Sequence, residues 1–154
     1  MKYIIGIDLG GTNIKAGLVK ADTGEVVTST SIKTESEKGI EDTFSRIANL
    51  VETILKENGI EKSNVQGVGM GIPGPVMHQA VVGFFANFPW EKDVDAKALL
   101  EGKIGIPVKV DNDVNVIAAG EAWLGAAKGY KNVVCLALGT GVGGGIIING
   151  NLVD

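Results

Sequence analysis

The chain has 154 residues, of which 45% are hydrophobic and 21% are charged. This length suits one ordinary domain with a core of its own, and the composition is that of a globular protein rather than a disordered one. The net charge of −4, without a run of basic residues, argues against binding to nucleic acid or to an anionic membrane. No apolar stretch reaches the ~18 residues of a membrane span.

Cysteine and histidine are nearly absent. The single Cys135 and the single His78 leave no intrachain disulfide and no Cys/His ligand set for zinc. Cys135 lies in an apolar run and is expected to be a buried thiol, whereas His78 is expected to be solvated in a loop. Asp8 interrupts the apolar N-terminus and no cleavage site follows, which argues against a signal peptide. We expect a cytoplasmic protein.

Glycine is the outlier of the composition. The chain holds 23 glycines, about twice the usual share. Because glycine weakens helices and strands, this excess predicts several turns that need positive φ or that approach a ligand closely.

In chain order, the first elements predicted are three short strands and a helix. The strands are expected at residues 2–8, 14–20 and 25–33. Tight turns separate them, which indicates an antiparallel meander. From Ile40 to Ile54, apolar residues then recur at spacings of four, three, four and three, as on one face of an amphipathic helix that Asn58 and Gly59 end.

The rest of the chain alternates strands with helices. Strands are expected at residues 65–72 and 107–111, a loop at 73–94, a short helix capped by Asp95, and a longer helix at 113–128 before Gly129. A further strand, glycine turn and strand begin at Val133. This order predicts an α/β fold: a mixed sheet with three antiparallel strands and βαβ crossovers, and with helices on both of its faces.

The turn between the first two strands has the chemistry of an anion site. Gly10 and Gly11 leave backbone N–H groups unshielded, and Thr12 and Asn13 add side-chain donors. Asp8, at the end of the first strand, would repel a polyphosphate unless Mg²⁺ stood between them, bound through water. The alternative is an ordinary hairpin turn, since many of these contain Gly-Gly.

A second segment repeats this plan near the C-terminus. IDLGGTNIKAGLV and LALGTGVGGGIII share an apolar strand, Leu-Gly, a Thr among glycines and a second apolar strand. Gly139, Thr140 and Gly141 therefore form a second candidate phosphate turn, with coincidence between two Gly- and Ile-rich segments as the alternative. Two matches to G-x-G-x-x-G, at residues 69–74 and 139–144, lack the following helix of a dinucleotide site, and no P-loop motif occurs.

The third group of polar residues is DNDVN at residues 111–115, where a strand passes into a helix. Ligands of open α/β sheets bind at such junctions. A carboxylate here can act as a general base and Asn112 can hydrogen-bond a polyol, whereas the alternative is a helix N-cap. Trp90 and Trp123 are expected to be packing residues rather than a stacking platform.

Taken together, five motifs resemble the ROK sugar kinases, particularly their glucokinases. They are MKYIIGIDLGGTNIKAGLV, GMGIPGPV, NFPW, VDNDVNVIAAGEAWLGAAKG and LALGTGVGGGIIING, in order along the whole chain. The resemblance implies the actin-like (ribonuclease H-like) fold and an ATP-dependent transfer to a hexose, with glucose and its 6-hydroxyl the expected acceptor.

The resemblance also implies roles for the motif residues. Asp113 would be the general base that takes the proton of the attacking sugar hydroxyl. Asn112 and Asn87, with the backbone near Gly71 and Gly74, would hold the other hydroxyls of the sugar.

The two turns would hold ATP. Asp8, Gly10, Gly11, Thr12 and Asn13 would form the first phosphate site, with Asp8 on Mg²⁺. The second site, formed by Gly139, Thr140 and Gly141, would lie on the far side of a cleft. In-line positioning and charge stabilisation are most of what phosphoryl transfer requires.

Family members are about twice as long as this chain. They carry a sugar-binding Glu-x-Gly-His segment, usually a Cys-rich zinc motif, and an adenosine-binding segment, none of which occurs here. We therefore interpret residues 1–130 as an N-terminal actin-like lobe and 131–154 as the first hairpin of a truncated second lobe.

Two hypotheses of different class follow. In the first, the chain is the N-terminal part of a hexose kinase and is incomplete for catalysis. In the second, it is a non-catalytic domain that binds phosphate weakly and forms a homo-oligomer through the unpaired strand edge at residues 133–154. A sugar-responsive repressor of the same family is disfavoured, because the first strand begins at residue 2, without a preceding helix-turn-helix.

Overall fold

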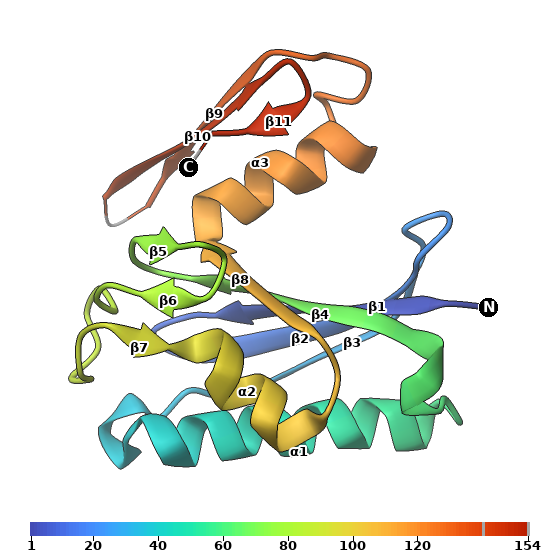
Figure 1. Ribbon diagram of the computed structural model, residues 1–154, viewed down its shortest axis with the longest axis vertical. Helices are drawn as coiled ribbons and strands as arrows, with labels where there is room; N and C mark the ends of the chain where they lie inside the picture. The colour runs from blue at the N-terminus through green and yellow to red at the C-terminus, as the bar shows by residue number, and fades with distance from the viewer. Residues whose placement is uncertain (140, 154) are drawn as a thin grey trace.

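The computed structural model describes residues 1–139 and 141–153. A five-stranded mixed sheet of order β3-β2-β1-β4-β8 lies at its centre (Figure 1). Its strands are β1 (Tyr3–Leu9), β2 (Asn13–Lys20), β3 (Val26–Lys33), β4 (Val65–Ile72) and β8 (Val108–Asn112). The pairs β1–β2 and β2–β3 are antiparallel, and β4 is parallel to both β1 and β8. This confirms the predicted meander and crossovers.

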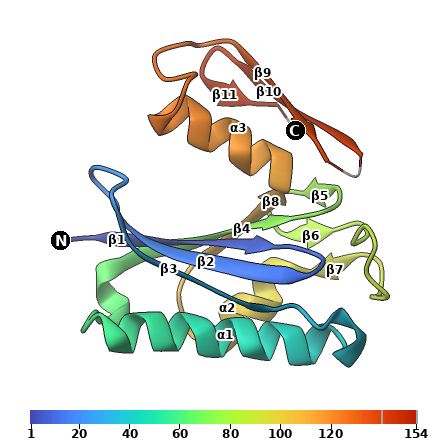
Figure 2. The same ribbon diagram turned by 180° about the vertical axis from the view of Figure 1, so that it is seen from behind.

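Helices cover both faces of this sheet, as predicted (Figures 1 and 2). The helical segments are η1 (Ser36–Lys38), α1 (Ile40–Glu57), η2 (Lys62–Asn64), α2 (Ala96–Ile104) and α3 (Asp113–Leu124). The first two α-helices lie on one face and α3 lies on the other. The Asp95 carboxylate caps α2 as expected, accepting a hydrogen bond from the backbone N–H of Ala98 at 2.9 Å.

The core lies between the sheet and α1. Alternate residues of β1 and β2 point into it, because side chains on a strand alternate between its faces. The apolar stripe of α1 meets them, and Phe44, Ile47 and Val51 are completely buried. Trp90 also packs here: its ring lies 4.9 Å from that of Phe85, and its indole N–H donates to the backbone oxygen of Ser36 at 2.9 Å. The packing role predicted for Trp90 is confirmed.

The segment expected to be a loop contains a small sheet of its own. Its strands are β5 (Val76–Met77), β6 (Val81–Val82) and β7 (Val94–Asp95), in the order β5-β6-β7. Each has only two residues, too few for the alternation by which strands are recognised. His78 lies exposed in the turn between β5 and β6.

A third sheet follows α3 and packs against it. Its order is β11-β10-β9, with β9 (Val133–Leu138), β10 (Val142–Ile148) and β11 (Asn151–Leu152). The third strand, β11, was not predicted. Cys135 on β9 is half-buried rather than buried.

The predicted end of the last helix, at residue 128, was wrong. The helix ends at Leu124, and Gly125 is extended with φ −101° and ψ −151°. The Glu121 carboxylate accepts a hydrogen bond from the backbone N–H of Ala126 at 2.8 Å, and residues 125–128 form turns. A side chain that competes for backbone donors ends the helix one turn before the glycine signal at residue 129.

Candidate active site

Three parallel strands end at the same edge of the central sheet. Asp8 on β1 lies opposite Gly71 on β4, and Gly71 lies opposite Asp111 on β8. The carboxyl ends of parallel strands are the usual ligand-binding edge of an open α/β sheet. Two carboxylates that are far apart in sequence therefore flank one glycine.

Gly71 brings α3 onto this edge. It is buried, and a Cβ added to it would lie 3.4 Å from the Cα atom of Asp113 and 3.6 Å from a methyl group of Val116. These are ordinary van der Waals distances, so the first turn of α3 packs directly over Gly71. Asp113 is half-buried at the start of this helix.

Asp113 is close enough to Asp8 to influence the ionisation of the Asp8 carboxyl group. Partial burial raises the pKa of the Asp8 carboxyl group, the negative charge of Asp113 raises it further, and the nearby ammonium of Lys15 opposes this rise. Two neighbouring carboxylates ionise together at a cost, which a cation between or beside them would reduce. The sequence placed both residues in one site, and the structure brings them together.

The turn after β1 is held by a residue that the sequence analysis did not single out. Thr34 is completely buried, and its hydroxyl donates to the backbone oxygen of Gly10 at 2.6 Å. Its backbone N–H also donates to the backbone oxygen of Thr12 at 2.9 Å. Gly11 and Thr12 are exposed at the tip of this turn. No local sequence pattern marks Thr34, because its burial and its bonds depend on the turn after β1, which is far from it in the chain.

The side chain of Asn112 is already engaged. Its Oδ1 accepts a hydrogen bond from the backbone N–H of Val114 at 3.0 Å, so it caps α3, and its Nδ2 donates to the backbone oxygen of Gly74 at 2.8 Å. Asn112 is therefore the N-cap of α3, the role that the sequence analysis gave as the alternative for this motif. The same contact ties the loop after β4 to the strand edge, beside Asp113.

Asn87 lies in the loop between β6 and β7. It is exposed, with φ at 65°, a left-handed conformation that asparagine tolerates better than most residues. The N–H of its neighbour Ala86 donates to the backbone oxygen of Pro73 at 2.7 Å. The loop of Asn87 thus runs beside the loop that contains Gly74.

The second glycine turn joins β9 to β10. The backbone N–H of Gly139 donates to the oxygen of Gly141 at 2.9 Å, and Thr140 lies outside the described residues. The glycines that follow serve helix packing. A Cβ on Gly143 would overlap a methyl group of Val114, and one on Gly145 would lie 2.9 Å from the Cβ of Ala118. Strand β10 therefore lies directly against the first turns of α3.

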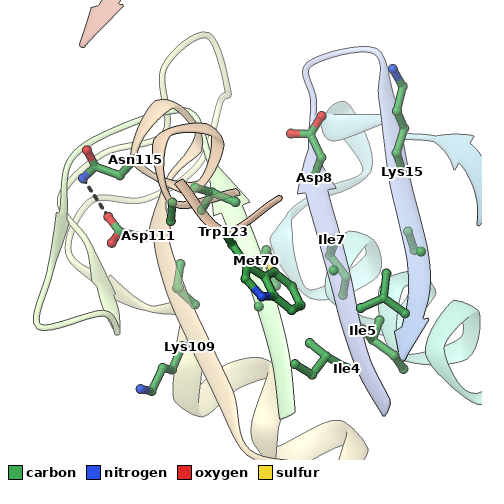
Figure 3. A pocket seen from close by; sticks show the side chains of 18 of the residues that line it. Ile4, Ile5, Ile7, Asp8, Lys15, Met70, Lys109, Asp111, Asn115 and Trp123 are labelled. Atoms are coloured by element: carbon green, nitrogen blue, oxygen red, sulfur yellow. Dashed lines mark hydrogen bonds between the residues drawn. The ribbon is translucent and has the colours of Figure 1, made fainter. Parts of the chain in front are cut away.

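A cavity of about 600 Å³ separates α3 from the central sheet (Figure 3). Three glycines in one row, Gly17, Gly6 and Gly69, form part of its floor. Trp123 lines the opposite wall and is 44% exposed. Trp123 packs beside Gly24, where an added Cβ would lie 3.3 Å from its ring, and the rest of its side chain borders the cavity.

Several known proteins resemble the chain. A sequence model of the ROK family matches residues 4–154. The glucokinase of Halalkalibacterium halodurans is 38% identical over 152 residues, which are 98% of this chain and 46% of that protein. The chain thus spans about half the length of the curated relatives it matches.

Solved structures agree in fold. A ROK family glucokinase from Streptomyces griseus, in complex with glucose and AMPPNP, matches with a TM-score of 0.84 and 36% identity over 97% of this chain and 46% of its own. The inorganic polyphosphate/ATP-glucomannokinase of an Arthrobacter strain matches with a TM-score of 0.86 and 32% identity over 99% of this chain and 61% of its own. The predicted actin-like fold is confirmed.

Among the described residues, no helix is both long and apolar enough to span a membrane. The match of the family to nearly the whole chain, together with the shared fold, leads to one conclusion. The chain belongs to the ROK family and is a homologue of its sugar kinases.

Proposed function

We propose that this chain is part of a kinase that transfers the γ-phosphoryl group of ATP to a hexose, with the 6-hydroxyl of glucose as the acceptor. Residues 1–130 would form its first lobe and residues 131–154 the opening hairpin of its second. The carrying observation is the closeness of Asp113, in the first turn of α3 over Gly71, to Asp8 at the ligand-binding edge.

Asp113 is the proposed general base. It stands at the first position of α3, half-buried, and its Oδ1 accepts a hydrogen bond from the backbone N–H of Val114 at 2.9 Å. The second oxygen can accept the proton of a sugar hydroxyl as that hydroxyl attacks phosphorus. A base that is fixed at a strand edge provides the positioning on which phosphoryl transfer depends.

The proposed sugar ligands surround Asp113. The Asn112 amide keeps one N–H beyond its bond to Gly74, because a side-chain amide carries two donor hydrogens. Asn87 and the backbone around Gly71 and Gly74 supply further polar groups from the adjacent loops. Glucose, mannose and their N-acetylated derivatives differ in the group or its orientation at carbon 2.

The proposed phosphate ligands are the two turns. Gly10, Gly11, Thr12 and Asn13 offer backbone and side-chain donors beside Asp8, and Gly139 and Gly141, with Thr140, would approach from the second hairpin. When bound, Mg²⁺ would offset the negative charge of the phosphates. In the described part of the chain no three His, Cys, Asp or Glu residues gather for a metal. Asp8 would hold Mg²⁺ through water, and the phosphates would supply its other ligands.

A second candidate function is self-association. The outward side chains of the third sheet are exposed and apolar: Val134 is 69% exposed, Leu136 68%, Leu138 81% and Val142 77%. Strand β9 is also an edge strand, open to pairing with another chain. Light scattering at rising concentration tests this, and a monomer at millimolar concentration would contradict it.

The kinase proposal is tested by sugar-dependent ADP release from MgATP, with glucose, mannose and N-acetylmannosamine as acceptors. Asp113→Asn should abolish any turnover, and Asp93→Asn is the matched control. Asp93 is exposed and has φ at 56°, so asparagine fits there equally well. Equal turnover in the Asp113 variant and the wild type would contradict the general-base role.

Binding provides an independent readout where turnover is absent. Glucose should shift the amide resonances of Asn112, Asp113 and the loop of Asn87, because these groups surround the proposed acceptor site. A folded chain whose resonances shift with none of the three hexoses would count against the proposed sugar site.

A further inference from the structure

Arg46 joins α1 to the end of β3, and none of the recognised motifs includes it. Its Nη1 donates to the backbone oxygen of Lys33 at 2.7 Å, and its Nη2 donates to the backbone oxygen of Thr34. Its Nε pairs with the carboxylate of Asp42, one turn earlier in the helix, at 2.8 Å, and the side chain is only 24% exposed. All three nitrogens of the guanidinium group are therefore engaged, which fixes the orientation of the group.

Thr34 carries this contact on to the first glycine turn. Its hydroxyl donates to the backbone oxygen of Gly10, and its N–H donates to that of Thr12. Its remaining polar group, the backbone oxygen, is the one that Arg46 binds. Thr34 is completely buried, so without Arg46 this oxygen would have to move or admit water. The two bonds to the turn would move with it.

The backbone leaves the sheet directly after Thr34. Glu35 has φ at 50° and ψ at 52°, a left-handed conformation that is uncommon for residues other than glycine. Such a conformation persists where the surrounding contacts hold it. Pairing with β2 holds Lys33 on one side, and the bonds from Arg46 hold Lys33 and Thr34 on the other. The end of β3 is thus clamped between β2 and α1.

We propose that Arg46 is a positioning residue for the phosphoryl donor: through Thr34 it holds the turn at residues 10–12 in the conformation that binds phosphate. This inference rests on the proposed function. Asp8 stands on the face of the sheet away from α1, because its neighbours on β1 are buried in the core. Arg46 belongs to the α1 face (Figure 1), so it acts through Thr34. A turn that is held before the ligand arrives binds it more tightly, because less of the binding energy is spent on ordering the turn.

The test is calorimetric titration of the chain with inorganic tripolyphosphate in the presence of Mg²⁺. Arg46→Met removes the donors, whereas Arg46→Lys keeps the charge but cannot reproduce the planar fork that bridges two carbonyl groups. Both variants should weaken tripolyphosphate binding by about fivefold, the order of one lost hydrogen bond.

Val51→Ala is the control for a general loss of stability. Val51 is completely buried on the same helix, and its truncation lowers stability without touching the turn. The affinity of this variant for tripolyphosphate should stay within about twofold of the wild type, because the two sites share no partner.

Amide hydrogen exchange without ligand shows whether the turn itself loosens. Urea is added so that all variants have the same free energy of unfolding. The amide of Gly10, which donates to the backbone oxygen of Asn13 at 3.1 Å, and the amide of Thr34 should then exchange faster in both Arg46 variants than in Val51→Ala. Equal exchange rates would contradict the positioning role.

Four results of the titration would also overturn the inference. They are unchanged binding by Arg46→Met, wild-type affinity in Arg46→Lys, an equal loss in Val51→Ala, and no binding of tripolyphosphate by the folded wild-type chain. Arg46-dependent binding by a chain that phosphorylates no hexose would support the positioning role and count against the proposed reaction alone.

Discussion

The two glycine-turn hairpins share a sequence plan but are supported in different ways. The β1–β2 hairpin has α1 against one face, strands on both sides and the buried Thr34 behind its turn. The β9–β10 hairpin has α3 against one face and exposed apolar side chains on the other. A motif therefore determines what a turn can bind, whereas the packing around it determines how firmly the turn is held.

The largest expected difference is in core packing. Ile14 on β2 is completely buried, whereas Leu138 on β9 is 81% exposed. Ile14→Ala should lower the free energy of unfolding by about 3 kcal/mol, through lost burial and a cavity, and Leu138→Ala by less than about 0.5 kcal/mol. Urea denaturation measures both. Similar losses in the two variants would show that the second hairpin is as well buried as the first.

The contact between α3 and β10 should respond to a single methyl group. Gly143→Ala would overlap Val114, whose branched side chain has little freedom to move. We expect a loss of about 1–3 kcal/mol, seen as faster hydrogen exchange of the β9 and β10 amides. Gly144→Ala is the control, because a Cβ at this position would have only the backbone oxygen of Cys135 nearby, at 4.0 Å. Unchanged exchange in the Gly143 variant would contradict the close packing.

Support of the first turn should depend on one hydroxyl. Thr34→Val keeps the shape of the side chain and removes the hydrogen bond to the backbone oxygen of Gly10. The expected cost is about 1–2 kcal/mol, because a partly buried acceptor loses its partner. Thr30→Val, at an exposed position of β3, is the control. Amide hydrogen exchange at Gly10 and Asn13 measures the effect on the turn. If these amides remain as protected in Thr34→Val as in the wild type, the support by Thr34 is contradicted.

The smallest expected effect concerns pH. Partial burial and then the charge of Asp113 raise the pKa of Asp8 above that of an unfolded aspartate, while Lys15 opposes the rise. The folded chain therefore binds this proton more tightly than the unfolded chain, and ionised Asp8 destabilises the fold as pH rises through its folded-state pKa.

Two substitutions separate the effect of the Asp113 charge on the pKa of Asp8 from that of the Lys15 charge. Asp113→Asn should lower the pKa of Asp8 and reduce that pH dependence, whereas Lys15→Met should raise the pKa. Carboxyl ¹³C titration measures both shifts. A pKa of Asp8 that is the same in both variants and in the wild type would contradict the closeness of the three groups.

Much of the fold could be predicted because it depends on local patterns. Alternation along β1 and β2, the stripe from Ile40 to Ile54 and the cap at Asp95 are signals within a few residues of each other. The strands β5, β6 and β7 have two residues each, and their pairing depends on contacts with distant segments. The end of α3 was missed because the Glu121 side chain outweighed the helix-forming residues that follow it.

The candidate site divides in the same way. Residue type and motif were enough to select Asp8, the turn at residues 10–12 and Asp113, because the residues next to each of them in the sequence indicate its chemistry. Lys15, Thr34 and Trp123 could not, because each acquires its place from a neighbour on another strand or helix. Gly143 and Gly145 follow the second glycine turn directly in the sequence, and only their contact with α3 showed that they serve packing.

By itself, the sequence determined the order of the longer strands and helices, the mixed sheet and the two glycine turns, because strand alternation, helix periodicity and turn chemistry act over a few residues. Only the tertiary structure decided which side chains share the ligand edge, since register across β2, β1, β4 and β8 aligns residues that are far apart in the chain. The two hairpins show this most clearly. Their sequences are alike, and the elements packed against them made one a supported turn and the other a half-covered sheet.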